Sequence, residues 1–403
     1  MRASDLNLRH LKAMIATASS GSISAAAYQV SLTQPAVTQG IARLERQLGL
    51  TLFERCPGGM EPTDAAKLLV PRALAALALI GSARATAPQL RAFLALARRG
   101  SYKAASLDAG TREPSLHRAV SDLSLSLGQK LVERRGRGVA LTPRGLALAR
   151  RFRLADAELC AGLAELEQLK GREVGRITIG AMPLSRARLL PKAVAAFHRM
   201  HPQVDVSIVE GSYAELIGPL RDGEIDLMLG ALRDEPSGED VLQHSLFEDR
   251  PVILGRAGHP LLGQPVTPER LAACEWVLPG EGTPLREQWR RMFGGDVDPP
   301  RVTIECGSVI VIRQLLVEGD YLTLLSPDQV AVELAAGWLA RVGAAPGDPS
   351  RTIGITTRAN WRPTKLQERF LDIIDGQASQ IREAGLACTN GKNGISIGHG
   401  ERS

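Results

Sequence analysis

The 403-residue chain lacks the motifs that mark most enzymes, metalloproteins and membrane proteins. Its five cysteines are far apart and no two have C-x-x-C spacing, which indicates neither a zinc site nor a disulfide framework and fits a reducing cytoplasm. No run of 18 apolar residues occurs, so no membrane span is expected. The phosphate-binding pattern G-x-x-x-x-G-K-[ST] and the nucleophile pattern G-x-S-x-G are also missing. We therefore expect no catalysis, no cofactor and no metal.

Two features that suggest other classes of protein have simpler explanations. His198 and His201 are three residues apart, but no carboxylate or cysteine is grouped with them, so we interpret them as surface residues. Residues 13–27 resemble the signal peptide that a secreted solute-binding receptor would need, but Thr, Ser and Gly interrupt the apolar stretch. An amphipathic helix followed by a turn explains this stretch better.

Positive charge is concentrated in the N-terminal part, although the whole chain carries a formal charge of only +6. Residues 1–150 contain 21 Lys and Arg against 9 Asp and Glu, whereas residues 151–403 contain 28 against 34. This asymmetry favours a polyanion-binding module joined to an acidic remainder. A basic surface that is merely solvated would have the same composition.

The basic part contains an internal repeat. With an offset of 79 residues, 15 of the 46 pairs across positions 10–55 are identical and no gap is needed. The identical positions include Gly21, Gly49, Pro35 and the small-residue pair Ala25 and Ala26. The repeat has to be recognised before a fold is assigned, because each copy is one structural unit.

Each copy is predicted to form a winged helix-turn-helix. The first helix ends at Gly21 or Gly100, and a short second helix begins at the N-cap Ser22 or Ser101. The third helix starts after Thr33 and has a proline in its first turn, where a missing N–H costs nothing. Two short extended segments then form the wing. The third helix has one apolar stripe, repeated in copy two, which consists of Val37, Ile41, Leu44 and Leu48.

The polar face of the third helix in copy one suits the major groove of DNA. Glutamine and threonine near the N-terminus of such a helix are able to hydrogen-bond base edges, and Arg43 is able to hold a phosphate. A helix-turn-helix used only for protein contact is the alternative. The residues predicted to contact DNA in this copy are Thr33, Gln34, Pro35, Ala36, Thr38, Gln39, Arg43 and Arg55.

The stretch GSISAAAYQVSLTQPAVTQGIARLERQLGLTLFER, residues 21–55, closely resembles the DNA-binding domain of LysR-type transcriptional regulators. That family has a second helix of small residues, then S/T-Q-P-A-V-S/T-x-x-I-x-x-L-E, then L-G-x-x-L-F-x-R, and this sequence matches nearly every position. The chain resembles the subgroup that carries tandem winged helices. The resemblance implies binding to double-stranded promoter DNA, self-association as a dimer or tetramer, and contact with RNA polymerase.

Copy two departs from the family pattern, because Gln34 is replaced by Glu113. Copy two is nevertheless the more basic: residues 81–150 carry 13 basic against 4 acidic residues, compared with 8 against 5 in residues 1–80. A glycine-flanked arginine wing could follow a phosphate backbone or enter a minor groove. We expect copy one to read most of the bases. The alternative is that copy two is degenerate and serves only as a spacer. The candidate DNA contacts of copy two are His117, Arg118, Arg134, Arg135 and Arg137.

An Ala/Leu-rich helix is expected after each wing. Pro71 is expected to bend or end the first, over residues 64–85. The second, over residues 143–170, has a coiled-coil-like stripe of Leu159, Leu163, Leu166 and Leu169. By the family resemblance, this second helix joins the DNA-binding and regulatory domains and dimerises.

The region 175–375 alternates short β-rich runs with helical segments, which predicts an α/β fold with largely parallel sheets. The chain is expected to cross between two lobes near 250–260 and to return near 345–358. The predicted strands are 175–181, 204–211, 224–231, 250–257, 301–306, 321–326 and 351–359. The segments GRITIGAMPLSRARLLPKAVAAFHRMHPQVDVSIVEG, DGEIDLMLG and WRPTKLQERFLDII resemble the LysR effector-binding domain.

A small-molecule effector is expected between the two lobes, at the carboxyl ends of the strands. Ser185 and Ser308 are expected to cap helices whose N-termini face the cleft, a setting that favours an anion, although plain N-capping is the alternative. The predicted effector contacts are Pro183, Leu184, Ser185, Ser212, Ala231 and Ser308.

The sequence thus predicts two all-α-rich winged helix-turn-helix copies plus an α/β, two-lobed, periplasmic-binding-protein-like effector domain. The expected function is that of a cytoplasmic, effector-controlled transcription regulator. The expected boundaries are 5–66 for copy one, 67–87 for a connecting helix, 88–145 for copy two, 146–171 for a linker and dimerisation helix, 172–376 for the effector domain and 377–403 for a disordered tail.

Overall fold

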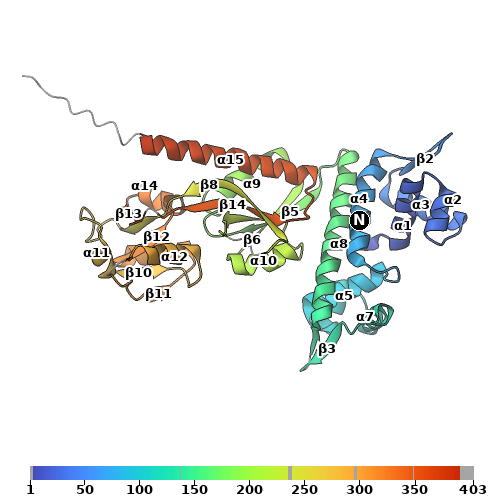
Figure 1. The fold of residues 1–403 in the computed structure, drawn as a ribbon, viewed down its shortest axis with the longest axis horizontal. Helices are drawn as coiled ribbons and strands as arrows, with labels where there is room; N and C mark the ends of the chain where they lie inside the picture. Colours follow the sequence, from blue (N-terminus) through green and yellow to red (C-terminus); the bar gives the residue numbers. More distant parts are fainter. Residues whose placement is uncertain (1–2, 137, 235–237, 295–296, 348, 391–403) are drawn as a thin grey trace, which may run out of the picture.

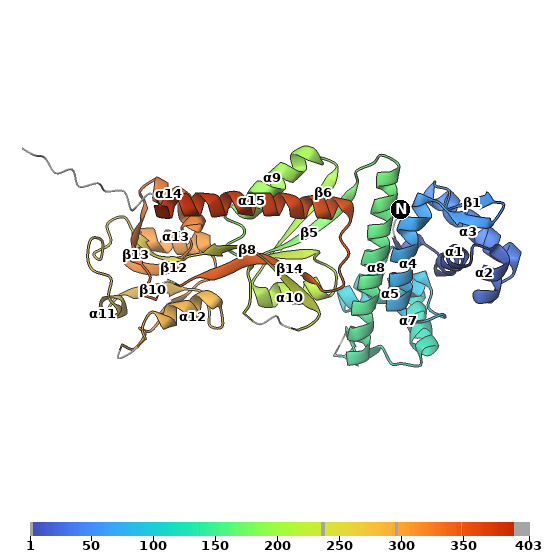
Figure 2. The same ribbon diagram turned by 45° about the horizontal axis from the view of Figure 1, so that its top comes forward.

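The computed structural model describes residues 3–136, 138–234, 238–294, 297–347 and 349–390. The two repeat copies lie at one end of an elongated molecule and the two lobes at the other (Figure 1). The helix α8 (Pro143–Leu169) stands between the two ends, and Figure 2 shows the same arrangement from a second direction.

Copy one forms the predicted helices and wing. Thr33 caps the third helix, since its hydroxyl accepts a hydrogen bond from the Ala36 N–H, and Gly21 and Gly49 end helices in the left-handed conformation. A 3-10 turn, η1 (Ala3–Asp5), precedes this copy. Its elements are α1 (Leu8–Ser20), α2 (Ile23–Gln29), α3 (Gln34–Leu48), β1 (Phe53–Cys56), β2 (Gly59–Pro62) and α4 (Asp64–Ile80).

Copy two repeats this order, and each of its helices and strands begins 79 residues after its counterpart. The wing attaches in the same way in both copies: the Met60 N–H donates to the Gly21 carbonyl, and the Val139 N–H to the Gly100 carbonyl. The elements of copy two are α5 (Ala87–Arg99), α6 (Tyr102–Ala109), α7 (Glu113–Leu127), β3 (Val132–Arg135), β4 (Gly138–Leu141) and α8.

The two long helices α4 and α8 pack side by side along their lengths, and α4 continues through Pro71 instead of ending there. Leu159 and Leu166 of the expected dimerisation stripe are buried in one continuous core that joins both copies. Leu169 at the end of the stripe is exposed. Most of this stripe is thus covered by the same chain, and the expectation that α8 also takes part in dimerisation stays a prediction.

Lobe I is a five-stranded sheet in the order β6-β5-β7-β14-β8, with helices on its faces. The helix α15 runs along this lobe and packs on α9 and β8. The elements are β5 (Gly175–Ala181), α9 (Leu189–Met200), β6 (Val204–Glu210), α10 (Tyr213–Arg221), β7 (Leu227–Ala231), β8 (Val241–Asp249), β14 (Arg351–Arg358) and α15 (Lys365–Asn390).

Lobe II is a second five-stranded sheet, in the order β11-β10-β12-β9-β13. Trp276 and Trp289 are fully buried in its core. The elements are β9 (Val252–Arg256), α11 (Pro268–Ala272), β10 (Glu275–Leu278), α12 (Pro284–Arg291), β11 (Ile304–Glu305), α13 (Val309–Glu318), β12 (Tyr321–Leu325), η2 (Pro327–Val330), α14 (Ala331–Ala335) and β13 (Leu339–Ala344).

The lobes confirm the two predicted crossings, which lie between β8 and β9 and between β13 and β14. The sheets are mixed and not largely parallel, because β14 runs antiparallel to β7 and β8, and β9 antiparallel to β12 and β13. The tail prediction is wrong for residues 377–390, which continue α15, and the rest of the predicted tail lies outside the described residues. Within the described chain, no helix is long and apolar enough to cross a membrane.

Candidate nucleic-acid interface and inter-lobe pocket

The third helix of copy one presents a polar face away from its core. Val37, Leu44 and Leu48 are buried beneath it, which fixes the rotation of the helix. Burial and the neighbouring Arg43 lower the pKa of His10, so the positive charge on this side of the helix comes from the arginine at neutral pH. Every predicted contact of this copy is exposed: Thr33, Gln34, Pro35, Ala36, Thr38, Gln39, Arg43 and Arg55.

A carboxylate in copy one ties this helix to the wing. Glu45 Oε1 accepts hydrogen bonds from the Leu52 N–H at 2.8 Å and the Phe53 N–H at 3.4 Å. Copy two has Ser124 at this position, whose hydroxyl donates instead to the Val120 carbonyl of its own helix. The third helix is therefore linked to the wing by one more side chain in copy one than in copy two.

Copy two presents a different set of groups. Its third helix begins after Arg112, which makes no side-chain capping bond, and Glu113, Arg118 and the wing residues Arg134 and Arg135 are exposed. The His117 ring packs on Tyr102 with centroids 4.8 Å apart, so one face of this candidate is already covered. Arg137 lies outside the described residues.

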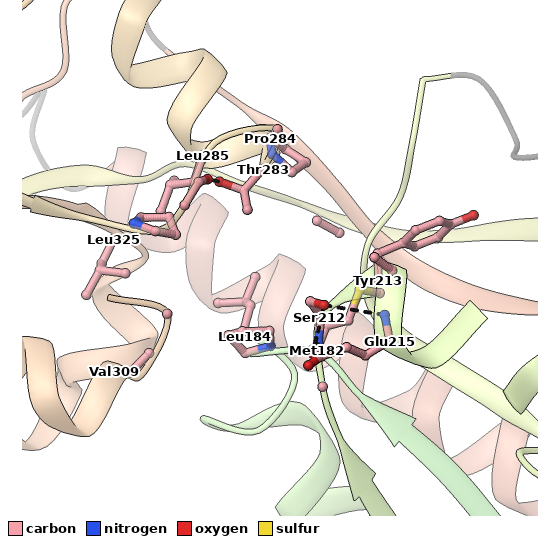
Figure 3. Close-up of a pocket in the computed structure, with 18 of the residues that line it drawn as sticks. Met182, Leu184, Ser212, Tyr213, Glu215, Thr283, Pro284, Leu285, Val309 and Leu325 are labelled. Atoms are coloured by element: carbon pink, nitrogen blue, oxygen red, sulfur yellow. Dashed lines mark hydrogen bonds between the residues drawn. The ribbon is translucent and has the colours of Figure 1, made fainter. Parts of the chain in front are cut away.

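A cavity of about 630 Å³ lies between the lobes, and Figure 3 shows side chains from both lobes around it. Four of the predicted contacts line it: Pro183, Leu184, Ser212 and Ala231. The sequence missed the wall from lobe II, which includes Thr283, Leu285, Val309 and Leu325.

Two of the predicted serines do not line this cavity. Ser185 is buried and donates its hydroxyl to the Met182 carbonyl, while α9 begins later, after Arg188. The expectation that each serine caps a helix facing the cleft is therefore wrong for Ser185. Ser308 does stand at the N-cap of α13, a helix whose first residue, Val309, lines the cavity, but its hydroxyl makes no capping bond.

Three arginines and three glutamates line the cavity, and most of them are already paired. Ser212 donates hydrogen bonds from its backbone N–H and its hydroxyl to Glu215, which lowers the pKa of that carboxyl and satisfies its charge. Arg351 pairs with Asp249 at 2.8 Å, but its buried Nη2 has no partner among the described residues. The Arg233 guanidinium lies 4.7 Å from the centre of the Tyr213 ring. Arg233 has no carboxylate partner among the described contacts and is thus available to a negatively charged group.

A buried ionic cluster links α4, α8 and the segment just before α15. Arg72 on α4 contacts Glu165 on α8 at 2.6 Å and Glu158 at 3.3 Å, and it donates to the backbone carbonyls of Arg362 at 2.8 Å and Pro363 at 3.4 Å. Burial alone would lower the pKa of Arg72, but the two glutamates outweigh burial and raise it. Because the cluster joins both repeat copies to lobe I, it is a physical connection between the two ends of the molecule.

Comparison with known proteins gives matches to both parts. A family described as the LysR substrate binding domain matches residues 170–379, and one described as bacterial regulatory helix-turn-helix protein, lysR family, matches twice, at 8–67 and 88–146. The HTH-type transcriptional regulator GalR of Pseudomonas putida is 34% identical over 367 residues, which cover 88% of this chain and 92% of that protein.

Two further comparisons agree with these matches. The SDS degradation transcriptional activation protein of a Pseudomonas species is 33% identical and covers 71% of this chain and 94% of that protein. The crystal structure of CbnR, a LysR family transcriptional regulator, covers 72% of this chain and 98% of its own, with a TM-score of 0.52 and 20% identity. This last likeness concerns the fold alone.

Proposed function

The chain belongs to the LysR family of DNA-binding transcriptional regulators, and on this basis we propose how its parts divide the work. Family membership confirms the resemblance of residues 21–55, the two-lobed α/β fold and the expectation of a regulator and not an enzyme. In the proposal, the chain acts in the cytoplasm on promoter DNA, and its effect on transcription passes to RNA polymerase.

Copy one reads base edges, and copy two adds phosphate contacts and readout of its own. The observation that best supports this division is that Gln34, Thr38 and Gln39 are exposed on the first half of α3, whose opposite face is buried in the core. Gln is able to make a bidentate hydrogen bond to adenine, and Thr is able to bond several bases. In copy two, Arg134 and Arg135 stand on an exposed wing, where they supply charge regardless of sequence.

The test compares specific with non-specific binding. Gln34→Ala combined with Thr38→Ala should weaken binding to the preferred duplex by about tenfold or more, because each good base contact contributes roughly 1–3 kcal/mol of discrimination. Binding to a scrambled duplex should change little. Arg199→Ala in lobe I, an exposed residue on α9, is the control. Equal losses on both duplexes would show that these residues do not read bases.

The effector is a small organic anion with an apolar body. Its negative group is held by Arg233, and its apolar part lies against Leu184, Leu285 and Leu325. A volume of about 630 Å³ is within the range of small-molecule sites. Closure of the lobes on the ligand changes their angle, and so the position of the DNA-binding end.

The effector class is tested by calorimetric titration with a panel of aliphatic and aromatic carboxylates and their neutral amides. Carboxylates should bind and the matching amides should not. Arg233→Met should weaken binding by at least about tenfold, since a hydrogen bond to a charged group contributes roughly 1.5–3 kcal/mol. Arg341→Met, an exposed residue outside the cavity, is the control. Equal affinity for acids and amides would refute an anionic effector.

A further inference from the structure

The helices that follow the two wings run antiparallel against each other. Residues near the start of α4 meet residues near the end of α8: a side chain placed at Gly162 would contact Leu69 at 3.1 Å. Residues at the end of α4 meet the first third of α8, since Arg151 donates to the Leu79 carbonyl at 2.8 Å. The pairing also places α3 and α7 on the side of the helix pair away from the lobes (Figure 1, Figure 2).

The contacts across this pair are reciprocal under the repeat offset of 79. Arg72 and Arg151 are equivalent positions of the two copies, and so are Leu79 and Glu158. Arg72 contacts Glu158, and Arg151 contacts Leu79. A contact from i to j matched by one from j to i is the signature of a two-fold interface, which here forms within a single chain.

The buried residues follow the same symmetry. On each helix they recur at spacings of 3, 4, 3 and 4, as in a coiled coil. Small side chains on both helices let them approach closely. The equivalent buried pairs are Ala66 and Gly145, Leu69 and Leu148, Ala73 and Phe152, Ala76 and Ala155, and Ile80 and Leu159.

From this internal two-fold we infer that one chain binds two unlike DNA half-sites in inverted orientation, without a second copy of the chain. A protein two-fold is mirrored by an inverted repeat in its DNA, with half-sites a whole number of helical turns apart. The inference rests on the proposed function, because it assumes that the exposed faces of α3 and α7 contact DNA. Association between chains, where it occurs, uses surfaces other than the α4–α8 pair, because these helices already cover each other.

The chemistry of the two faces defines the two half-sites. Gln34 and Gln39 on α3 suit adenine, so the first half-site is rich in A·T pairs. On α7, Arg118 suits the O6 and N7 acceptors of guanine, and Glu113 is able to accept from the amino group of cytosine. The second half-site is therefore rich in G·C pairs, and the complete site is an inverted arrangement of two different sequences.

The experiment uses a duplex that the full-length chain enriches from a random-sequence pool. Hydroxyl-radical footprints of the wild type, Gln34→Ala/Thr38→Ala and Glu113→Ala/Arg118→Ala are compared, with Arg199→Ala as the control. The altered residues are exposed, so the variants should fold. Each double variant should lose protection over one half-site, a different one for each, and keep the other. Affinity should fall about tenfold or more in each case.

Two results would overturn the inference. If Gln34→Ala/Thr38→Ala removes protection from both halves while Glu113→Ala/Arg118→Ala removes none, two copy-one modules from two chains occupy the site. If the enriched duplex contains two identical half-sites, the two faces do not read different sequences. Either result leaves the proposed function intact, whereas a wild-type chain that enriches no duplex would refute the proposed function itself.

Discussion

Replacing Arg72 with methionine should destabilise the DNA-binding end far more than the same change at Arg151, its counterpart in the repeat. Arg72 is only 7% exposed and holds Glu165, itself 10% exposed, through contacts of 2.6 Å and 3.3 Å. Methionine fills much of the same space, so the main loss is the positive charge. Glu158 keeps a second partner, because the Arg362 guanidinium lies 2.8 Å from it.

The expected cost follows from what remains after the substitution. A buried carboxylate left without its cation costs about 3–5 kcal/mol, and Glu165 would be in that position. Arg151 is exposed and donates one hydrogen bond from its Nε to the Leu79 carbonyl, which is worth about 0.5–1.5 kcal/mol. The two variants should therefore differ by roughly 1.5–4.5 kcal/mol in the free energy of unfolding.

Urea unfolding with two probes measures this difference. All four tryptophans, Trp276, Trp289, Trp338 and Trp361, lie in the C-terminal half, so fluorescence reports the lobes, whereas far-UV circular dichroism also reports the helices of the two repeat copies. Arg72→Met should lower the circular-dichroism midpoint more than the fluorescence midpoint. The separate probes are needed because a chain with several domains need not unfold in one step.

A second substitution provides the decisive control. Adding Glu165→Met to Arg72→Met removes the orphaned charge, and replacing a buried ion pair by apolar side chains is often neutral or stabilising. The double variant should therefore recover most of the lost stability. Equal costs for Arg72→Met and Arg151→Met, or no recovery in the double variant, would refute the argument that Glu165 is left uncompensated.

Three further predictions concern the wings and lobe II. Arg134→Ala/Arg135→Ala should reduce the slope of log affinity against log salt by up to about two, at roughly 0.9 per lost phosphate contact, and an unchanged slope would remove the wing from the phosphate backbone. Gly59→Ala should cost about 1–3 kcal/mol, because Gly59 has φ +129° and an added Cβ would lie 2.3 Å from the Gly21 carbonyl oxygen. At the equivalent Gly138 an added Cβ would lie 3.4 Å from the Gly100 carbonyl oxygen. Equal losses of thermal stability in Gly59→Ala and Gly138→Ala would contradict this reasoning. Burial lowers the pKa of His259, and the Asp320 carbonyl opposes this only in part. The contribution of neutral His259 to stability is therefore present above the unfolded pKa of about 6.5 and is lost as the pH falls through the lower folded pKa. His259→Asn should flatten the pH dependence of lobe II unfolding between about pH 7.5 and 5.

The local features of the repeat could be predicted from the sequence because they depend on near neighbours. Gly21, Gly49 and Thr33 act where the pattern placed them, since caps and helix-ending glycines are set within one turn. The offset of 79 also carried the elements of copy one onto copy two without adjustment.

Features that depend on contacts between distant residues could not be predicted from the sequence. The strands β8, β10 and β13 were not predicted, and β13 pairs with β9 through an irregular register between Arg341 and Gly343. His201 was expected at the surface but is buried, with Glu173 2.6 Å from its ring nitrogen. The lobe II wall of the cavity comes from separate elements, with Leu285 on α12, Val309 on α13 and Leu325 on β12, so no periodic pattern connects its residues. The leucine stripe of α8 was recognised, but no local signal shows that its partner is α4.

The ionic cluster at Arg72 has no exact counterpart in copy two, so the two ends of the helix pair are not equivalent. At the equivalent position in copy two, Arg151 donates to Leu79 of α4, and its neighbours Arg150 and Arg153 pair with Asp240 and Asp222 of lobe I. Lobe I is therefore held at both ends of the helix pair, but by different contacts at each end. Two identical reading units would leave a promoter site the same when it is turned around. Here α3 and α7 present different side chains, and lobe I is tied to the two copies by different contacts, so reversing the site in a promoter would turn the bound chain end for end. The orientation of a site, and not only its sequence, would then be part of the regulatory signal.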